Sequence, residues 1–587
     1  MRIPAILIAF LITSTSVIQA QTKEISLEEI WNGTFRQERL QSLQSLNNGE
    51  EYVVLNNDRN SGTTSIDVYS YKSGNKTKTL LNSADLDGIQ SFQDFKFSED
   101  ENKLLLSTEV EPIYRRSSRQ LIYIYDLKSK KLSPLSENKV QEADFSPDAS
   151  KVAYVFENNI YLYDIASGKE TQVTNDGKIN SIINGITDWV YEEEFGFVQA
   201  FAWNKDGSKL AYLKFKEDEV PEFSMDLFGQ DLYPTQSVFK YPKAGESNSE
   251  VSLYMYDVAS KASEAIELGD YNDFYIPRIK WTSKAMILSV QVLNRHQNDL
   301  DLIFVDAEDN SAKVVMNETD KAYIDITDNL TFLEDNSFIW TSEKDGYNHI
   351  YHYAEDGSLI NQVTSGEWEV TNYYGFDKKA KKIYYQSTEN GSVNRDVYSI
   401  SPNGKNKQRL TEKTGMNAAD FSADYTYFIN NYTSTTTPSI YTLHQAKSGK
   451  QVREILNNKK LLEVESPYGF SSKELSTIQI NGNELNMWMI KPSNFDENKK
   501  YPLLMFQYSG PGSQTVSNSY SGTNDYWYQL LADKGYIIAS VDGRGTGYKG
   551  AEFKKVTYKE LGKFEVEDQI AAAQKLGQLN YIDADRI

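Results

Sequence analysis

Three consecutive carboxylates form the stretch of this chain whose side chains most clearly suggest a binding function. Glu192, Glu193 and Glu194 follow two aromatic residues, Trp189 and Tyr191, within a region of tyrosine-rich strands. Adjacent like charges repel, and their usual outcome is a solvated turn of helix. The aromatic side chains, however, would anchor such a turn and restrict the carboxylates. A fixed pair of carboxylates that faces a cavity binds a cation, so the segment is a candidate cation-binding site.

Tyr508 is a second candidate because of its place in the chain. It follows the apolar run Leu503 to Phe506 and precedes the turn Gly510 to Gly512. The carboxyl ends of strands are where α/β sheets place their active sites. The alternative is that Tyr508, one of 40 tyrosines, caps a hydrophobic core.

The glycine-rich stretch from Asp542 to Gly550 superficially resembles a phosphate-binding loop. A dinucleotide site requires such a loop to open a helix directly, with an acidic residue about 20 positions later. We expect further loop from Gly550 to Lys555, and therefore no dinucleotide and no other cofactor.

A repeated unit of short strands organises residues 45–460. Its closing strands start 38 to 54 residues apart, except for one interval of 93 residues, at Val68, Ile122, Ile160, Leu253, Leu302, Ile350, Val397 and Ile440. Periods near 45 residues with several strands each are typical of propeller blades. The long interval contains the glutamates and the irregular segment Glu222 to Pro242, which we expect to project as an arm.

Residues 461–587 show a different pattern. Apolar strands at Leu503 to Phe506 and Tyr536 to Val541 alternate with helices expected at Asp525 to Lys534 and Phe564 to Leu576. This alternation predicts an α/β domain with a largely parallel sheet. The chain stops at Ile587, where another strand should begin, so we expect this domain to be incomplete.

The composition narrows the functional classes. A net charge of −22 argues against nucleic acid or an anionic membrane as partner. There is no cysteine, hence no disulfide and no thiol nucleophile, and the four histidines offer no metal site. Residues 1–20 read as a signal peptide, with an uncleaved anchor as the alternative; either predicts an exported protein, periplasmic or secreted.

Together, Asp188 to Glu194, Tyr508 to Gln514, Asp542 to Gly550 and the eight-unit array resemble the dipeptidyl peptidase IV family of the prolyl oligopeptidase group of serine peptidases. The resemblance implies an eight-bladed β-propeller on residues 45–460, an N-terminal segment at residues 21–44 packed on the second domain, and the first part of an α/β-hydrolase on residues 461–587.

The resemblance also implies roles for single residues. Glu193 and Glu194 match the pair that holds the α-ammonium of a peptide with a free N-terminus. Arg115 matches the arginine that meets the carbonyl of the substrate's second residue from the cut. Tyr508 matches the tyrosine of the oxyanion hole, and the arm Glu222 to Pro242 matches the segment used for homodimer contact. The family's middle-blade arginine, which lies beside an aromatic residue, has no clear counterpart in the sequence.

The resemblance further implies an exported serine exopeptidase that releases X-Pro or X-Ala dipeptides. The family's serine, acid and histidine would follow Ile587, and no histidine occurs after His444. We therefore expect the 587 residues alone to be inactive. A prolyl tripeptidyl peptidase is one alternative, and a non-catalytic propeller that binds peptides is another.

Overall fold

The computed structural model describes residues 23–520 and 522–587, so the expected signal peptide lies outside the described residues. Within them, eight successive antiparallel sheets contain four or five strands each. Their strands are β1 (Leu43–Ser45), β2 (Glu51–Asp58), β3 (Thr63–Ser70) and β4 (Lys76–Asn82); β5 (Asp94–Phe97), β6 (Lys103–Pro112), β7 (Ser118–Asp126) and β8 (Lys131–Pro134); β9 (Gln141–Phe145), β10 (Lys151–Phe156), β11 (Asn159–Asp164) and β12 (Lys169–Gln172); β13 (Ile182–Asn184), β14 (Phe201–Trp203), β15 (Lys209–Lys216), β18 (Glu250–Asp257) and β19 (Ala262–Ala265); β20 (Phe274–Trp281), β21 (Ile287–Asn294), β22 (Asp299–Asp306) and β23 (Ala312–Thr319); β24 (Thr331–Phe332), β25 (Phe338–Ser342), β26 (His349–Tyr353) and β27 (Leu359–Gln362); β28 (Val370–Asp377), β29 (Lys382–Ser387), β30 (Asp396–Ile400) and β31 (Gln408–Arg409); β32 (Met416–Phe421), β33 (Tyr427–Ser434), β34 (Thr437–Gln445) and β35 (Gln451–Leu456).

The repeat seen in the sequence corresponds to one sheet per unit. Each of the eight closing-strand residues lies in the third main strand of a different sheet, from β3 to β34. This strand lies inside the sheet, and residues such as Val68, Ile160 and Val397 on it are fully buried. The repeat is therefore visible in the sequence because an interior strand must be apolar.

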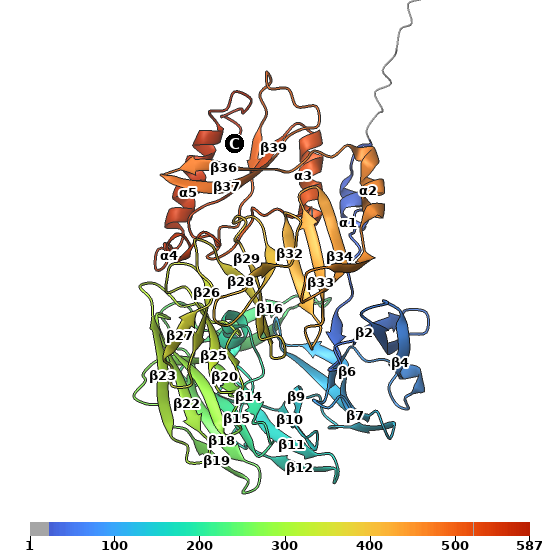
Figure 1. Ribbon diagram of the computed structural model, residues 1–587, viewed down its shortest axis with the longest axis vertical. Helices are drawn as coiled ribbons and strands as arrows, with labels where there is room; N and C mark the ends of the chain where they lie inside the picture. The colour runs from blue at the N-terminus through green and yellow to red at the C-terminus, as the bar shows by residue number, and fades with distance from the viewer. Residues whose placement is uncertain (1–22, 521) are drawn as a thin grey trace, which may run out of the picture.

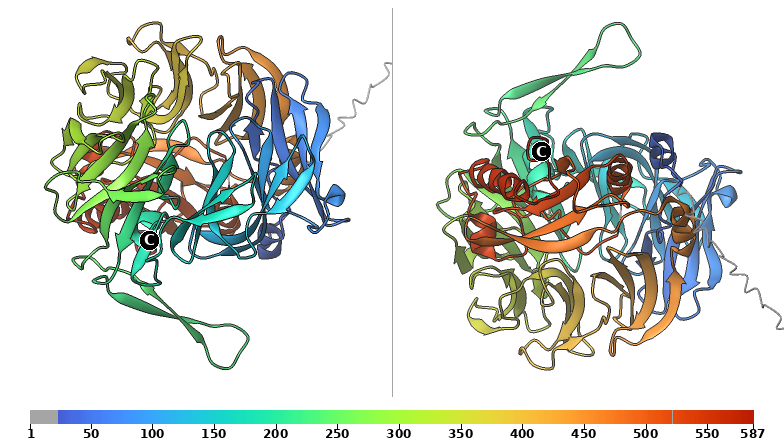
Figure 2. Two further views of the ribbon diagram at one scale, coloured as in Figure 1. Left: turned by 90° about the horizontal axis from the view of Figure 1, so that it is seen from below. Right: turned by 90° about the horizontal axis from the view of Figure 1, so that it is seen from above.

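The sheets follow one another around a ring, and the C-terminal part covers one end of it (Figures 1 and 2). The first and last sheets meet, because the amide of Ala423 donates to Ser45 Oγ at 2.9 Å and Arg453 donates to the carbonyl of Tyr71. Buried Val54 and Leu443 belong to the same hydrophobic cluster at this junction. The arrangement is that of a propeller.

One hairpin stands apart from the ring. Strands β16 (Glu222–Leu227) and β17 (Thr235–Lys240) pair only with each other among the described strands. The hairpin projects from the fourth sheet as an arm (Figure 2). Its tip exposes large apolar side chains, with Phe228 82%, Leu232 88% and Tyr233 79% accessible.

The C-terminal sheet corrects one expectation. It contains β36 (Glu474–Ile480), β37 (Asn483–Ile490), β39 (Ile537–Asp542) and β38 (Leu503–Met505), in that order. Only β38 and β39 are parallel; the other two described pairings are antiparallel, so the prediction of a largely parallel sheet is wrong for these residues. Apolar runs show that a strand is buried, but they carry no information about its direction.

Five helices accompany this sheet in the described residues: α1 (Leu27–Trp31), α2 (Lys459–Glu465), α3 (Thr523–Asp533), α4 (Ala551–Lys555) and α5 (Lys563–Leu576). Helices α1, α2 and α3 share a hydrophobic cluster that includes Ile30, Leu461 and Leu530, so the N-terminal segment packs on the C-terminal part. The expected loop from Gly550 to Lys555 is wrong, because α4 begins at Ala551. This helix is only five residues long, and both of its lysines are buried.

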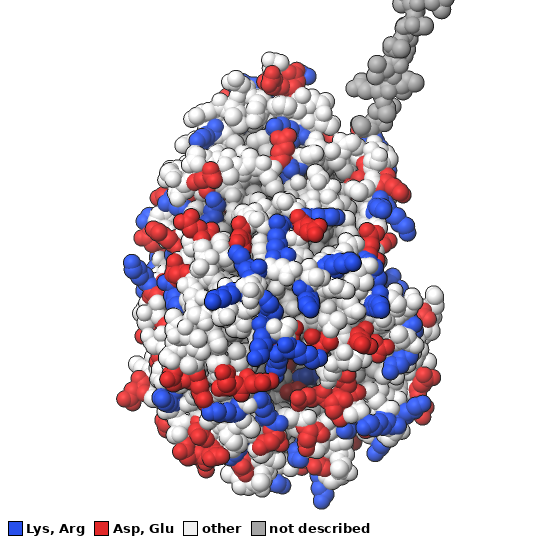
Figure 3. Space-filling view, in the orientation of Figure 1, with Lys and Arg blue, Asp and Glu red and all other residues white. Residues whose placement is uncertain are grey.

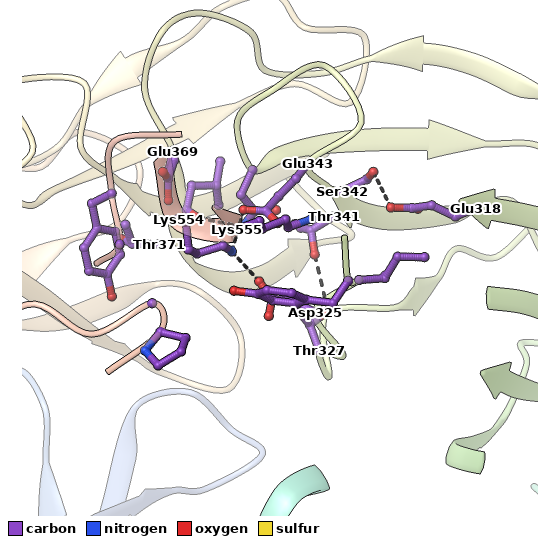
Figure 4. A pocket seen from close by; sticks show the side chains of 18 residues that line it. Glu318, Asp325, Thr327, Thr341, Ser342, Glu343, Glu369, Thr371, Lys554 and Lys555 are labelled. Carbon is purple, nitrogen blue, oxygen red and sulfur yellow. Dashed lines mark hydrogen bonds and ion pairs between the residues drawn. The ribbon is translucent and has the colours of Figure 1, made fainter. Parts of the chain in front are cut away.

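Helix α4 joins the two parts through a buried ionic cluster beside a cavity of about 350 Å³ (Figure 4). Glu343 Oε1 lies 2.6 Å from Lys554 Nζ, and its Oε2 lies 2.9 Å from Lys555 Nζ. Asp325 and Asp320 supply the second carboxylate for each lysine. Burial opposes the charged form of Lys554, but the charges of Asp325 and Glu343 outweigh it and raise the pKa of Lys554 above its ordinary value, so Lys554 is a cation at neutral pH.

Substituting Glu343 tests the strength of this junction. Glu343→Gln removes the carboxylate between two buried cations, and breaking a buried pair costs about 3–5 kcal/mol. We expect chemical denaturation to show a loss of this order and limited proteolysis to cut the C-terminal part faster. Glu560→Gln, which removes the exposed pair with Lys563, should change stability by less than about 1 kcal/mol. Equal stability of the two variants would contradict a stabilising role for the cluster.

Candidate active site

The glutamates lie on a single wide turn, a π-helical segment at Tyr191–Phe195. Buried Asp188 fixes the start of this turn, since its carboxylate accepts from the Tyr191 amide at 2.9 Å and from Ser249 Oγ. The Tyr191 hydroxyl accepts from the Ile276 amide at 2.9 Å. The aromatic side chain therefore anchors the turn in the core.

Glu192 differs from its two neighbours because it is only 2% exposed. Its Oε1 accepts from the amides of Arg116 at 2.7 Å and Ser117 at 2.9 Å. These amides belong to the loop between β6 and β7, in the second sheet. Glu192 thus joins this loop to the turn of the fourth sheet. A solvated turn is therefore the wrong description for Glu192.

This junction brings two of the predicted site residues together. Arg115 Nε donates to Glu193 Oε2 at 2.8 Å, with the arginine side chain 69% and the glutamate side chain 27% exposed. Glu194 is exposed, and among the described residues it has no hydrogen bond or ion pair. The site therefore presents two accessible carboxylates beside one guanidinium.

Tyr508 lies where the sequence places it, three residues past the end of β38 and 72% exposed. The next residue, Ser509, has a φ of 57°, a conformation that is uncommon for residues other than glycine. At the far end of the loop, the Asp542 carboxylate accepts from the amides of Thr515 and Val516 at 3.0 and 2.8 Å. Within the described residues, no hydrogen bond or ion pair joins Tyr508 to the glutamates or to Arg115.

Arg278 is a site residue that the sequence did not indicate. Its Nη2 donates to the carbonyl of Phe195 at 2.9 Å, its Nε pairs with Asp328 at 2.5 Å, and its guanidinium lies 5.0 Å from the Phe197 ring centre. It holds the end of the glutamate turn from β20, in the next sheet. An arginine in a strand carries no distinguishing pattern, so no sequence signal could have identified it.

Other acids lie near the glutamate turn. Burial raises the pKa of Asp188, although the hydrogen bonds from Ser249 and Tyr191 oppose this shift. Burial, together with the charge of Asp188, raises the pKa of Glu217 to about 7. Burial also raises the pKa of Glu142. The face of the molecule in Figure 3 carries basic and acidic side chains interspersed.

The described residues contain neither a metal-binding cluster nor a membrane-spanning helix. Within residues 23–520 and 522–587, no group of three or more histidine, aspartate or glutamate side chains is arranged to hold a metal ion. In the same residues, no helix is long and apolar enough to cross a membrane. Helix α4 directly follows the glycine-rich loop, and its two lysines, Lys554 and Lys555, are paired with carboxylates in the ionic cluster described above.

Comparison with known proteins agrees with this geometry. Residues 98–439 match the dipeptidyl peptidase IV N-terminal region, and residues 523–587 match the prolyl oligopeptidase family. The chain belongs to the dipeptidyl peptidase IV family. The family resemblance inferred from the glutamate motif is confirmed.

Individual relatives show how far the similarity extends. The crystal structure of Porphyromonas gingivalis dipeptidyl peptidase 4 superposes with a TM-score of 0.91 at 41% identity, over 96% of this chain and 80% of that one. A probable dipeptidyl-aminopeptidase B of Pyrenophora teres f. teres is 31% identical over 96% of this chain and 67% of its own length. A structure from Bacteroides ovatus, at 24% identity and a TM-score of 0.78, shares the fold. The chain thus spans about two thirds of the fungal relative.

The shifted pKa of Glu217 gives a pH-dependent stability. Its folded pKa of about 7 exceeds the ordinary value of 4.5, so folding favours the protonated form. The resulting stability is present below pH 4.5 and is lost as pH rises towards 7. Because Gln mimics the protonated form, Glu217→Gln should be more stable than the wild type at about pH 8, by at most about 3 kcal/mol, and similar at about pH 4.

Thermal unfolding at these two pH values measures the effect. Glu219→Gln is the matched control, because Glu219 is exposed two residues away. Equal stability of Glu217→Gln and the wild type at both pH values would show that folding does not raise the pKa of Glu217.

Proposed function

We propose that this protein is an exported serine exopeptidase that releases N-terminal dipeptides, X-Pro or X-Ala, from peptides. The observation that carries the proposal is the pair of accessible carboxylates, Glu193 and Glu194, beside Arg115, built between two sheets by buried Glu192. Such a set fits the ammonium and the first carbonyl of a peptide. No cofactor is required for this chemistry.

The α-amino group of a peptide suits this site. Its pKa of about 7.7–8 makes it largely cationic at neutral pH. Charge-assisted hydrogen bonds to Glu193 and Glu194 contribute roughly 1.5–3 kcal/mol each. Arg115, already paired with Glu193, has further donors for the substrate carbonyl. Arg278, whose guanidinium lies over the Phe197 ring, is our candidate for the family's middle-blade arginine. We propose that it stabilises the glutamate turn through its hydrogen bond to the Phe195 carbonyl.

Tyr508 is our candidate for the oxyanion hole. Its exposed phenol at the end of β38 can donate a hydrogen bond to a developing negative charge, and such donors lower activation barriers. We propose, as the family resemblance implies, that the attacking serine with its acid and base follows Ile587. The experiments below therefore use the full-length enzyme, and the 587 residues alone should give no turnover of a Gly-Pro chromogenic substrate.

Substitution of the two glutamates tests the recognition of the amine. Glu193→Gln and Glu194→Gln should each lower kcat/KM for free-amine dipeptide substrates by tens- to a thousand-fold, equivalent to roughly 2–4 kcal/mol. Acetylating the substrate amine should lower the wild-type value similarly. The variants should lose little more on the acetylated substrate, because both changes remove one interaction.

An exposed glutamate away from the proposed site provides the control. Glu250→Gln, on β18 with a side chain 70% exposed, should leave kcat/KM unchanged. Equal cleavage of free and acetylated peptides by the wild type would show that Glu193 and Glu194 do not recognise the free α-amino group. Release of tripeptides in place of dipeptides would identify a tripeptidyl peptidase instead.

We further propose that the eight sheets are eight propeller blades and that the arm forms a homodimer. The apolar side chains at the arm tip exceed what an isolated surface usually exposes. Replacing Phe228, Leu232 and Tyr233 with serine should convert a dimer to a monomer in sedimentation equilibrium without lowering the melting temperature of the monomer. A wild type that is monomeric at micromolar concentration would exclude the dimer.

A further inference from the structure

The loop that carries Tyr508 is held by an arginine from the propeller. Arg395 precedes β30 in the seventh sheet and is 3% exposed. Its Nη2 donates to Gln514 Oε1 at 2.7 Å, and its guanidinium stacks 3.9 Å from the centre of the Tyr548 ring. Gln514 and Tyr548 belong to the two loops of the C-terminal part, so Arg395 contacts both from across the domain junction.

The burial of Arg395 calls for an explanation, because among the described residues no carboxylate lies within ion-pair distance of it. Its remaining bonds go to the carbonyls of Ser392 at 2.9 Å and Asn394 at 2.8 Å. Burying a charge without an ionic partner costs several kcal/mol. Stacking on Tyr548 and charged hydrogen bonds offset part of this cost. A neutral side chain would serve packing alone at less cost.

The contacts continue from Gln514 to the Tyr508 ring. Ser513, next to Gln514, donates through both its amide and its hydroxyl to the carbonyl of Gly510, at 3.0 and 2.6 Å. Gly510 lies directly under the Tyr508 ring, since a Cβ there would sit 2.6 Å from Tyr508 Cε1. The orientation of the phenol therefore depends on the Gly510–Ser513 turn.

The second loop supports the same turn. The Gly512 amide donates to the carbonyl of Gly545 at 2.8 Å, and the Gly547 amide donates to the carbonyl of Ser513 at 2.9 Å. A Cβ on Gly547 would meet the Gly512 oxygen at 2.6 Å, so only glycine allows this approach. Tyr548, which follows Gly547, carries the stacked guanidinium. Arg395 thus holds both sides of the turn.

We propose that Arg395 is a positioning residue for Tyr508: it aligns the phenol with the developing oxyanion by fixing Gln514 and Tyr548 against the propeller. The inference rests on the proposed function of Tyr508. It assigns part of the catalytic rate to the propeller itself, in addition to the propeller's role in binding the substrate amine.

The test compares Arg395→Met with wild type in the full-length enzyme, using Gly-Pro p-nitroanilide. We expect kcat to fall by about 10- to 100-fold with KM changed less than about 3-fold, because a misplaced oxyanion donor affects the transition state and not substrate binding. In a Tyr508→Phe background, Arg395→Met should add less than about 2-fold. Guanidinium should restore part of the rate of Arg395→Ala.

Two further variants separate positioning from folding. Gln514→Leu removes the same contact from the other side and should reproduce the kcat loss; it decides the question if Arg395→Met does not fold. Arg409→Met, in the same sheet, removes an arginine whose partners Asp396 and Glu412 both lie in the propeller, and should leave kcat unchanged.

Each outcome is decisive. Three results would overturn the inference. The effects of Arg395→Met and Tyr508→Phe could multiply fully in the double variant. A folded Arg395→Met or Gln514→Leu enzyme could keep the wild-type kcat, or only KM could change. If the wild type does not cleave the substrate, or if Tyr508→Phe has no effect, the proposed function fails first. If the wild type cleaves and Tyr508→Phe slows it while Arg395→Met does not, only the inference fails.

Discussion

The buried carboxylate of Glu192 is the contact on which the arrangement of Arg115 and Glu193, the proposed recognition site, depends. It accepts from the amides of Arg116 and Ser117 in the loop between β6 and β7, and neither of these two donors has another acceptor in the described residues. A buried anion with two backbone donors is strongly directional, so the distance between the second and fourth sheets is fixed at this point. Arg115 and Glu193 then meet as a consequence. Their exposed ion pair contributes little to stability by itself, but it requires both segments to be in place.

The proposed site, which would measure a peptide from its amine to its scissile bond, spans the two parts of the chain. The glutamates lie on the propeller and Tyr508 lies on the C-terminal sheet, so the junction between them sets the length. That junction is polar: the Gly550 amide donates to Glu369 at 2.8 Å, and the lysines of α4 meet Glu343. Hydrogen bonds and ion pairs fix angles as well as distances, whereas an apolar interface of the same area permits sliding.

The sequence predicted the features that follow from periodic burial. The eight closing strands, the projecting arm, the C-terminal helices and the position of Tyr508 all derive from apolar runs and their interruptions. Strand direction in the C-terminal sheet was predicted wrongly, because a buried strand has the same composition either way. Helix α4 was missed because it is only five residues long, and because the partners that hold Lys554 and Lys555 are more than 200 residues away in the sequence. Glu192 could not be distinguished from Glu193 for the same reason: burial is a tertiary property.

The acids behind the glutamate turn show a conflict between stability and binding. Asp188 is fully buried, and burial together with its charge raises the pKa of Glu217 to about 7, so ionising both at neutral pH disfavours folding. A protein selected for stability alone would replace one of them with an amide. In their ionised forms, however, they add negative charge behind the turn that carries Glu193 and Glu194, and in a partly desolvated site such a charge acts on a cation over several ångströms. If the glutamates bind the substrate amine as proposed, this field attracts a protonated amine, gains little from a neutral first group and repels an anionic one. The cost in stability would then contribute to selectivity for a free amine.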